Sequence, residues 1–200
     1  MTISRLVKRM LRVCGYAGVV PVAIPYFRSD HRSEVEADIE KWGGIVFDEK
    51  PKSDFSALLK LLNDYKEFRN LYYFRVPKAR WFSLFCREEP TLHLQTPEIG
   101  GGLFIQHGFA TIINAEKIGR DCWINQQVTV GHSGKGRRPV IGDGVKIRAG
   151  AKVIGKITVG DDVAIGANAV VVKDVPPHCT VAGVPAKIVR QDGVRVDKPL

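Results

Sequence analysis

The sequence predicts a mainly β fold, namely a left-handed parallel β-helix that follows a short α-helical N-terminal region. An aliphatic residue recurs every six positions in the second half of the chain, and glycine often follows it. The first half shows helical spacing instead. A period of six belongs neither to an α-helix nor to an ordinary alternating strand. We therefore expect a helical region and connector over residues 1–97, and a β-helix domain with a C-terminal cap over residues 98–200.

The six-residue period has a physical cause. Three short strands make one triangular coil, in which each aliphatic residue points into the narrow core and small residues form the corners. The repeated aliphatic positions are Ile118, Ile124, Val130, Ile141, Ile147, Val153, Val159, Ile165 and Val171. Residues 99–176 predict roughly four coils of about 18 residues each. The flat sides of such a stack favour packing around a threefold axis, so we expect a homotrimer.

The N-terminal residues 1–14 predict a basic amphipathic helix. Apolar residues lie at helical spacing, and Arg5, Lys8, Arg9 and Arg12 occupy the other face. Such a helix either docks on its own protein with its basic face in water, or makes weak contact with an anionic membrane surface.

Two further helices are predicted before a proline-marked connector. Val35, Ile39 and Trp42 recur at helical spacing. A third helix starts after Ser53, a residue that caps helix N-termini well, and runs through to Tyr72.

Composition sets limits on compartment and partners. Hydrophobic residues make up 44% of the chain and charged residues 26%, which is typical of a soluble globular protein. The net charge of +9 suits a nucleic acid, a membrane surface or a phosphate-rich cofactor. The four cysteines are scattered without a C-x-x-C pair, which indicates free thiols in a reducing compartment. We expect a cytoplasmic protein with no nucleic-acid partner.

A break in the period marks a candidate phosphate-binding loop. Val130 and Ile141 are eleven positions apart, so five extra residues leave the coil within 131–139. This segment is rich in glycine and carries Lys135, Arg137 and Arg138, which suits the phosphates of a nucleotide-like ligand. The P-loop spacing is absent. The alternative interpretation is a solvated flexible loop.

His107 lies inside the repeat region, where the strict period is still forming. A lone histidine is by default structural, but its imidazole also suits general acid–base chemistry near neutral pH. Zinc is a competing use, since γ-type carbonic anhydrases bind metal on this fold. They need a closely spaced histidine pair, and no two histidines here are five apart, so we expect no metal.

Several segments together carry a resemblance to a known family. They are the His107 segment, Val128–Gly131, the Gly134-Lys135 loop, the coils 148–155 and 165–171, and the ending Val175-Pro176-Pro177 with Ala182–Ala186. Over residues 99–189 the chain resembles the serine acetyltransferase branch of the hexapeptide-repeat acyltransferases.

The resemblance implies an acetyl-CoA-dependent O-acetyltransferase with His107 as general base. It places acetyl-CoA in a groove between two subunits, with the pantetheine arm along small residues and the phosphates on basic ones. These cofactor-binding residues would be Ala149, Gly150, Gly166, Ala167, Lys135, Lys152, Lys187 and Arg190. The acceptor-binding residues would be Gln106, Arg137, Arg138 and His93.

Departures from the family pattern bear on the acceptor. Gln106 stands where serine acetyltransferases carry an acid that helps hold the serine ammonium. Leu92, beside His93, stands where they carry an aspartate that orients the histidine, and Arg138 replaces a second histidine. The helical part is shorter, which favours a trimer over a hexamer.

We therefore expect the acceptor to be a hydroxyl of a sugar or glycan precursor in capsule or exopolysaccharide biosynthesis. The alternatives are a serine O-acetyltransferase of cysteine biosynthesis and a non-catalytic trimeric scaffold.

Overall fold

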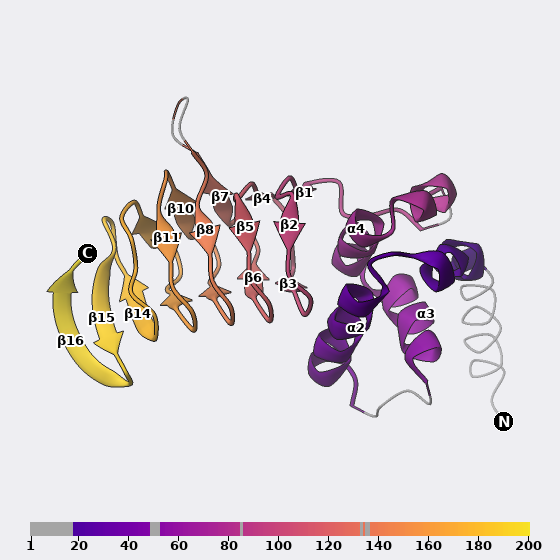
Figure 1. Cartoon of the computed structure of the whole chain (residues 1–200), viewed down its shortest axis with the longest axis horizontal. Coiled ribbons are helices and arrows are strands. Elements are labelled where there is room, and N and C mark those ends of the chain that lie inside the picture. The colour runs from indigo at the N-terminus through magenta and orange to yellow at the C-terminus, as the bar shows by residue number, and fades with distance from the viewer. Residues whose placement is uncertain (1–17, 49–52, 85, 133, 135–136) are drawn as a thin grey trace, which may run out of the picture. The chain divides into compact units, whose positions relative to one another are not determined.

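The computed structural model describes residues 18–48, 53–84, 86–132, 134 and 137–200. It divides the chain into two compact units, Met1–Glu89 and Pro90–Leu200. The first unit is helical and the second is built of strands (Figure 1). The second unit begins before the predicted boundary at residues 97 and 98, because Leu92–Leu94 already pairs with Thr111–Ile113.

Short helices make up the first unit, and each buries an apolar stripe. Its named elements are the 3-10 helix η1 (Ile24–Arg28), the α-helices α2 (Arg32–Val46), α3 (Asp54–Asp64) and α4 (Lys66–Arg75), and the 3-10 helix η2 (Pro77–Phe82). The predicted second helix is confirmed as α2, in which Val35, Ile39 and Trp42 are buried. The predicted helix over residues 1–14 lies outside the described residues.

The third predicted helix is two helices, so the prediction of one continuous helix is wrong. Ser53 caps α3 as expected, because its Oγ accepts a hydrogen bond from the Ser56 amide at 3.2 Å. The helix ends at Tyr65, whose backbone is extended. The Arg69 guanidinium stabilises this break by donating to the carbonyls of Leu62 and Asn63, each at 2.5 Å. α4 then starts at Lys66 and buries Phe68 and Tyr72.

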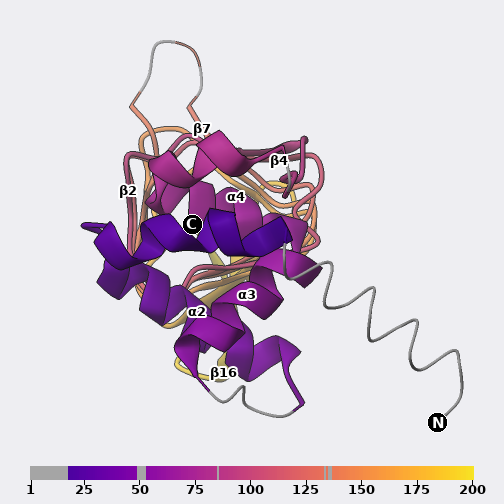
Figure 2. The same ribbon diagram turned by 90° about the vertical axis from the view of Figure 1, so that its right-hand side faces the viewer.

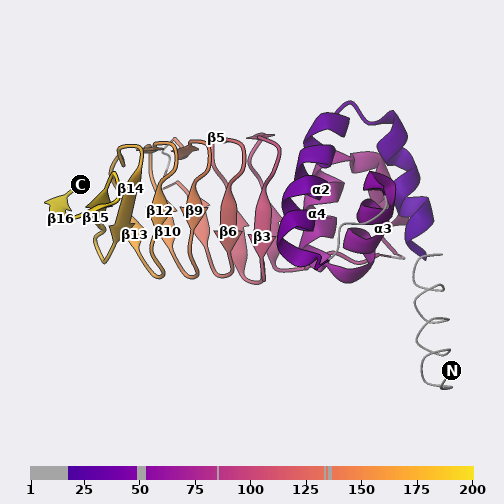
Figure 3. The same ribbon diagram turned by 90° about the horizontal axis from the view of Figure 1, so that it is seen from below.

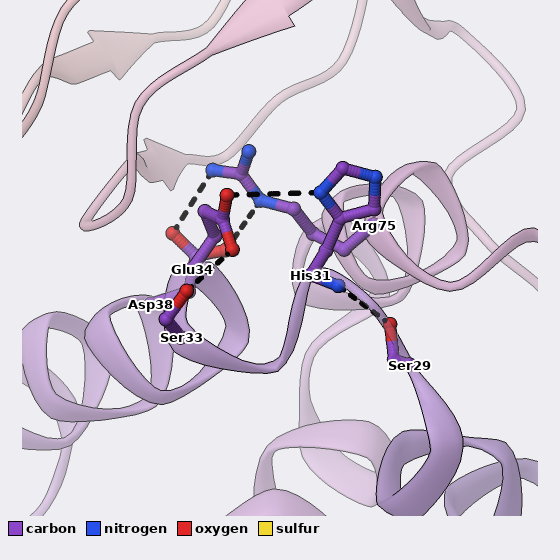
Figure 4. Close-up of polar contacts among 6 residues, drawn as sticks. All are labelled: Ser29, His31, Ser33, Glu34, Asp38 and Arg75. Carbon is purple, nitrogen blue, oxygen red and sulfur yellow. Dashed lines mark hydrogen bonds and ion pairs between the residues drawn. The ribbon is translucent and has the colours of Figure 1, made fainter.

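A buried ion pair joins α2 to α4 (Figure 4). Arg75 Nε lies 3.0 Å from Asp38 Oδ2, and the two side chains are only 3% and 2% exposed. The guanidinium donates a second hydrogen bond to Asp38 Oδ1 at 3.4 Å. Two opposite charges therefore compensate each other where neither could remain alone.

The second unit is a parallel β-helix whose strands form three sheets (Figure 3). The five-stranded sheet holds β1 (Leu92–Leu94), β4 (Thr111–Ile113), β7 (Thr129–Gly131), β10 (Lys152–Ile154) and β13 (Val170–Val171). The four-stranded sheet holds β2 (Glu98–Ile99), β5 (Lys117–Ile118), β8 (Val140–Ile141) and β11 (Thr158–Val159). The seven-stranded sheet holds β3 (Phe104–Gln106), β6 (Trp123–Asn125), β9 (Lys146–Ile147), β12 (Ala164–Ile165), β14 (Cys179–Ala182), β15 (Lys187–Gln191) and β16 (Val194–Pro199).

The six-residue period is confirmed as one side of each coil, so residues three periods apart stack on one another. Ile147 pairs with Ile165, 18 positions later, and Ile124 pairs with Ile147 across the five extra residues. None of the nine repeated aliphatic residues is more than 2% exposed. Seen end-on, the strands of each sheet overlie one another (Figure 2). Among the described residues the stack has five coils, one for each strand of the five-stranded sheet, where roughly four were predicted.

Glycine follows the repeated aliphatic residue because a side chain there would collide with the next coil. A Cβ on Gly119 would lie 2.6 Å from the carbonyl carbon of Gly142 and 2.7 Å from the amide nitrogen of Asp143. Such approaches are closer than side chains tolerate. The stack ends at a β-hairpin, in which β15 pairs antiparallel with β14 and β16 pairs antiparallel with β15, so the edge of β14 is covered.

Cys86, Cys122 and Cys179 are buried thiols. Burial raises the pKa of the Cys86 and Cys179 thiols, which leaves them protonated and unreactive at neutral pH. Among the described residues, no group of His, Cys, Asp and Glu side chains could hold a metal ion. In that same part of the chain, every helix is too short or too polar to span a bilayer.

Candidate functional site

His107 lies on a corner that is wider than the corners of the later coils. Eight positions separate Ile105 from Ile113, but six separate their partners Ile124 and Val130 in the next coil. Two extra residues therefore widen the turn that follows β3. His107 is exposed on this turn.

The wide corner is held in an uncommon backbone conformation. His107 and Ala110 both have positive φ, at 60° and 51°, which side-chain-bearing residues adopt only at a cost of about 1–3 kcal/mol. The His107 carbonyl accepts a hydrogen bond from the Phe109 amide. The Ala110 amide donates to Thr91 Oγ1 at 2.9 Å, and the Thr111 hydroxyl donates to the Phe109 carbonyl at 3.1 Å. The same positive φ recurs at other corners of the β-helix, such as Asp121 and His178, so it belongs to the corner geometry of the coils.

A row of three residues continues the corner below His107, and the last two of them are small. Strand register places Gln126, Ala149 and Ala167 beneath it, one to each coil, and we call this row the His107 edge. The Gly150 amide donates to the Gln126 carbonyl at 3.0 Å, and the Asn168 amide donates to the Ala149 carbonyl at 2.9 Å. Coils lie about 4.8 Å apart, so the row runs about 14 Å from His107 to Ala167.

The other residues expected to bind the cofactor lie at varying distances from this edge. Gly150 and Gly166 flank the row in sequence, and Lys152 follows it on β10. Lys152 Nζ donates to the carbonyls of Gln127 and Gly150 at 2.6 and 3.0 Å. Lys187 and Arg190 lie on β15, opposite Ala182 and Thr180 of β14. Lys135 lies outside the described residues.

Beside His107, the outer face of the seven-stranded sheet carries an aromatic and amide cluster. We call Phe104, Gln106, Trp123, Asn125 and Arg148 the outer cluster. The rings of Phe104 and Trp123 meet edge to face with centroids 4.7 Å apart, and Arg148 Cζ lies 5.5 Å from the Trp123 ring centroid. Asn125 Nδ2 donates to Gln106 Oε1 at 2.9 Å. The Gln106 amide oxygen is thereby occupied.

Three buried polar atoms in this area make no hydrogen bond to the described residues. They are Trp123 Nε1, Asn125 Oδ1 and Gln126 Oε1. A buried polar atom left without a partner costs about 1–3 kcal/mol, so such atoms are rare in folded proteins. All three atoms lie in the coil directly below that of His107.

Sequence reasoning missed Trp123 and Asn125. The signal was available, because β3 and β6 alternate inward and outward positions and stand 19 residues apart in register. Phe104 and Gln106 therefore face outward directly above Trp123 and Asn125.

The remaining predicted acceptor residues are not brought to His107 within one chain. Arg137 and Arg138 follow β7, at the edge between the five-stranded and four-stranded sheets, and we call this the loop edge. Arg138 Nη1 donates to Asn114 Oδ1 at 3.1 Å. His93 is exposed on the outer face of β1, opposite Ile112. The width of the five-stranded sheet separates the loop edge from the His107 edge.

Leu92 cannot orient the His107 ring. It is 4% exposed, and its side chain packs in the first coil. Within the described part of the chain, no carboxylate forms an ion pair with His107.

Comparisons with known proteins agree with this architecture. Residues 138–173 match the family described as bacterial transferase hexapeptide (six repeats). The chain is similar to the serine acetyltransferase of Synechococcus elongatus, with 46% identity over 103 residues, covering 50% of this chain and 42% of the relative. It is similar to the serine acetyltransferase of Staphylococcus aureus, with 50% identity over 105 residues, covering 50% of this chain and 49% of the relative. The chain thus spans under half the length of these curated relatives.

Solved structures extend the similarity beyond the repeats. The crystal structure of Neisseria gonorrhoeae serine acetyltransferase in complex with serine matches with a TM-score of 0.62 and 31% identity, covering 80% of this chain and 69% of that one. The soybean serine acetyltransferase apoenzyme matches with a TM-score of 0.61 and 29% identity, with the same coverage of 80% and 69%.

Proposed function

Because the chain belongs to the serine acetyltransferase-like hexapeptide-repeat acyltransferases, we propose that it is an acetyl-CoA-dependent O-acetyltransferase with His107 as its general base. The proposal rests on one observation: an exposed histidine on a widened corner heads a row that continues through the small residues Ala149 and Ala167. A flat row of small side chains suits a narrow, extended thioester arm, which would bring its acetyl group to His107.

The chemistry needs one group that can both accept and return a proton. His107 would accept the proton of the acceptor hydroxyl as its oxygen attacks the thioester carbonyl carbon. The carbon–sulfur bond then breaks, and the imidazolium returns the proton to the departing CoA thiolate. A backbone N–H at the corner would stabilise the oxyanion that forms between these steps.

Basic residues would hold the phosphates of acetyl-CoA. Lys187 and Arg190 lie on β15, toward the far end of the His107 edge, and Lys152 lies closer to His107. Lys135, in the loop after Val130, is proposed for the same role on its sequence context. Charge-assisted hydrogen bonds of this kind are worth about 1.5–3 kcal/mol each.

We propose that two copies of the chain complete each site. His107 and the arginines Arg137 and Arg138 lie on different edges of the β-helix. Packing around a threefold axis would set the His107 edge of one subunit against the loop edge of its neighbour. The site would then lie between subunits of a trimer.

L-Serine is the first acceptor to consider. The relatives above bear the name serine acetyltransferase, and one of their structures is a complex with serine. This support reverses the order that the sequence suggested, in which a sugar hydroxyl came first. Arg137 would pair with the serine carboxylate.

A neutral sugar hydroxyl is the second candidate, and the outer cluster favours it. Gln106 is uncharged, and its amide oxygen is engaged by Asn125, so it offers no anion to an ammonium group. Trp123 and the unsatisfied amide oxygens of Asn125 and Gln126 instead suit a hydroxyl-rich ligand.

A direct test follows CoA release by thiol titration with L-serine and with a panel of hexoses and methyl glycosides. A kcat/KM for L-serine of about 10⁴ M⁻¹s⁻¹ or above, ordinary for an enzyme on its own substrate, would establish serine. Faster turnover of a glycoside would establish the sugar. Thermal-shift titration with acetyl-CoA separates both from a non-catalytic scaffold, which would not bind it.

A further inference from the structure

Exposed apolar and basic residues recur at every third position in and after η2 of the helical unit. Trp81 is 90% exposed and Leu84 is 74% exposed, the highest values for large hydrophobic residues in the described part of the chain. Lys78 and Arg87 are exposed in the same stretch. We call Lys78, Trp81, Leu84 and Arg87 the η2 patch.

Buried contacts on both sides of Trp81 fix the backbone of the η2 patch. Ala79 is fully buried, and the buried Tyr73 hydroxyl donates to the Cys86 carbonyl at 2.7 Å. Asn70 clamps Glu89 from both sides, donating to its carbonyl at 3.0 Å and accepting from its amide at 2.8 Å. The backbone on both sides of Trp81 is thus fixed to the core. The exposure of Trp81 is a feature of the fold.

We propose that the η2 patch binds the surface of an anionic lipid bilayer. An indole ring partitions into the headgroup region, because its body is apolar and its N–H is polar. Leu84 adds apolar area, and basic side chains near an anionic surface each raise the partition coefficient by about fivefold. In the described part of the chain, neither Lys78 nor Arg87 forms an ion pair, whereas Arg80 is paired with Glu88 at 3.3 Å.

Charge favours a bilayer over two other partners. A second copy of this chain meeting the patch symmetrically would set its cations against the same cations. The phosphates of a nucleic acid would pair with the basic side chains and a base would stack on the indole, but Leu84 would have no apolar surface to contact. The net charge of +9 also draws the whole chain toward an anionic surface.

Co-sedimentation of the full chain with lipid vesicles tests the proposal. We expect binding to phosphatidylglycerol vesicles that falls with added salt, and little binding to phosphatidylcholine vesicles. The double variant Trp81→Ala/Leu84→Ala should lower the partition coefficient at least about tenfold. Lys78→Gln/Arg87→Gln should lower it about 25-fold. Val194→Ala removes a residue that is 65% exposed on β16, and it should leave binding unchanged.

Tryptophan fluorescence locates the contact. The chain has three tryptophans, of which Trp42 is 1% exposed and Trp123 is part-buried. Phosphatidylglycerol vesicles should shift the emission to shorter wavelength in the native chain. Trp81→Phe should keep the binding but remove the shift.

Two results would overturn the proposal. One is a native chain that ignores phosphatidylglycerol vesicles, or a Trp81→Ala/Leu84→Ala variant that binds them equally well. The other is a fall in solution mass in that variant with vesicle binding intact, which would make the patch a contact between copies. An unchanged helical circular dichroism signal and an unchanged urea unfolding midpoint show that the helical unit of each variant is folded.

Discussion

Residue 106 distinguishes the two proposed acceptors. A carboxylate there would lie beside His107 and could accept the hydrogen bond that Asn125 now donates to Gln106 at 2.9 Å. The neighbouring structure would therefore change little, while the charge facing an acceptor would change by one unit.

We predict that Gln106→Asp raises kcat/KM for L-serine about ten- to a hundredfold relative to a neutral hexose acceptor. The reason is a new charge-assisted contact to the serine ammonium, worth about 1.5–3 kcal/mol. Gln106→Asn is the matched control, since it shortens the side chain equally without adding charge. An equal gain in both variants would show that size, and not charge, governs selection.

At this scale the sequence indicated His107 and Gln106 but not Trp123 and Asn125. His107 was marked by its motif and by the irregular period around it. The outer cluster exists only after β3 and β6 pair, because register alone brings residues 19 positions apart into contact. The phosphate-binding role proposed for Lys135 rests on its sequence context alone.

At the scale of the coil, glycine corners differ in what surrounds them. A Cβ added at Gly119 would lie 2.6 Å from the carbonyl carbon of Gly142 in the next coil. A Cβ added at Gly131 would meet no atom within 4 Å. The two glycines follow the same kind of core aliphatic residue, Ile118 and Val130.

We predict that Gly119→Ala lowers the free energy of unfolding by about 1–3 kcal/mol, because the backbones of two coils must separate. Gly131→Ala should change the free energy of unfolding by less than about 1 kcal/mol. Alanine also restricts the unfolded chain, an effect that raises the free energy of unfolding. Urea unfolding followed by circular dichroism measures both. Equal losses at the two positions would contradict the role given to close coil packing.

In the helical unit, a buried ion pair between Asp38 and Arg75 joins α2 to α4. We predict that Asp38→Asn destabilises this unit by about 3–5 kcal/mol, because the Arg75 guanidinium stays buried without its counter-charge. Arg32→Gln is the control on the same helix. It breaks an exposed pair at 2.8 Å with Glu36 and should cost less than about 1 kcal/mol.

Urea unfolding of Asp38→Asn and Arg32→Gln, followed by the helical circular dichroism signal, measures both losses of stability. Equal losses of unfolding free energy would contradict the prediction that a buried ion pair contributes more to stability than an exposed one.

The existence of most helices and strands was predictable from the sequence, but their ends, the division of α3 from α4, and β1 were not. The strands follow from a strict period, and α2 follows from three apolar residues at helical spacing. The break at Tyr65 depends on Arg69 reaching back to two carbonyls, a contact that apolar spacing does not reveal. β1 was missed because Leu92–Leu94 precedes the regular six-residue period.

For the whole molecule, the proposed site requires more than one chain. His107 and the arginines after β7 are separated by the five-stranded sheet, so a single β-helix cannot close a site around both. We predict a solution mass of three chains by light scattering, with no loss of mass at catalytic concentrations. A fully active monomer would contradict the shared site.

In the proposed mechanism, His107 removes a proton from the acceptor hydroxyl during acetyl transfer. The most direct measurement compares CoA release by the native chain, His107→Ala and His178→Ala. His178 is a suitable control because it is exposed at a coil corner with φ of 57°, close to the 60° of His107. We predict that His107→Ala lowers kcat about 10²- to 10⁴-fold with acetyl-CoA affinity unchanged, and that His178→Ala retains native activity. A His107→Ala variant within a few fold of native kcat would contradict the account.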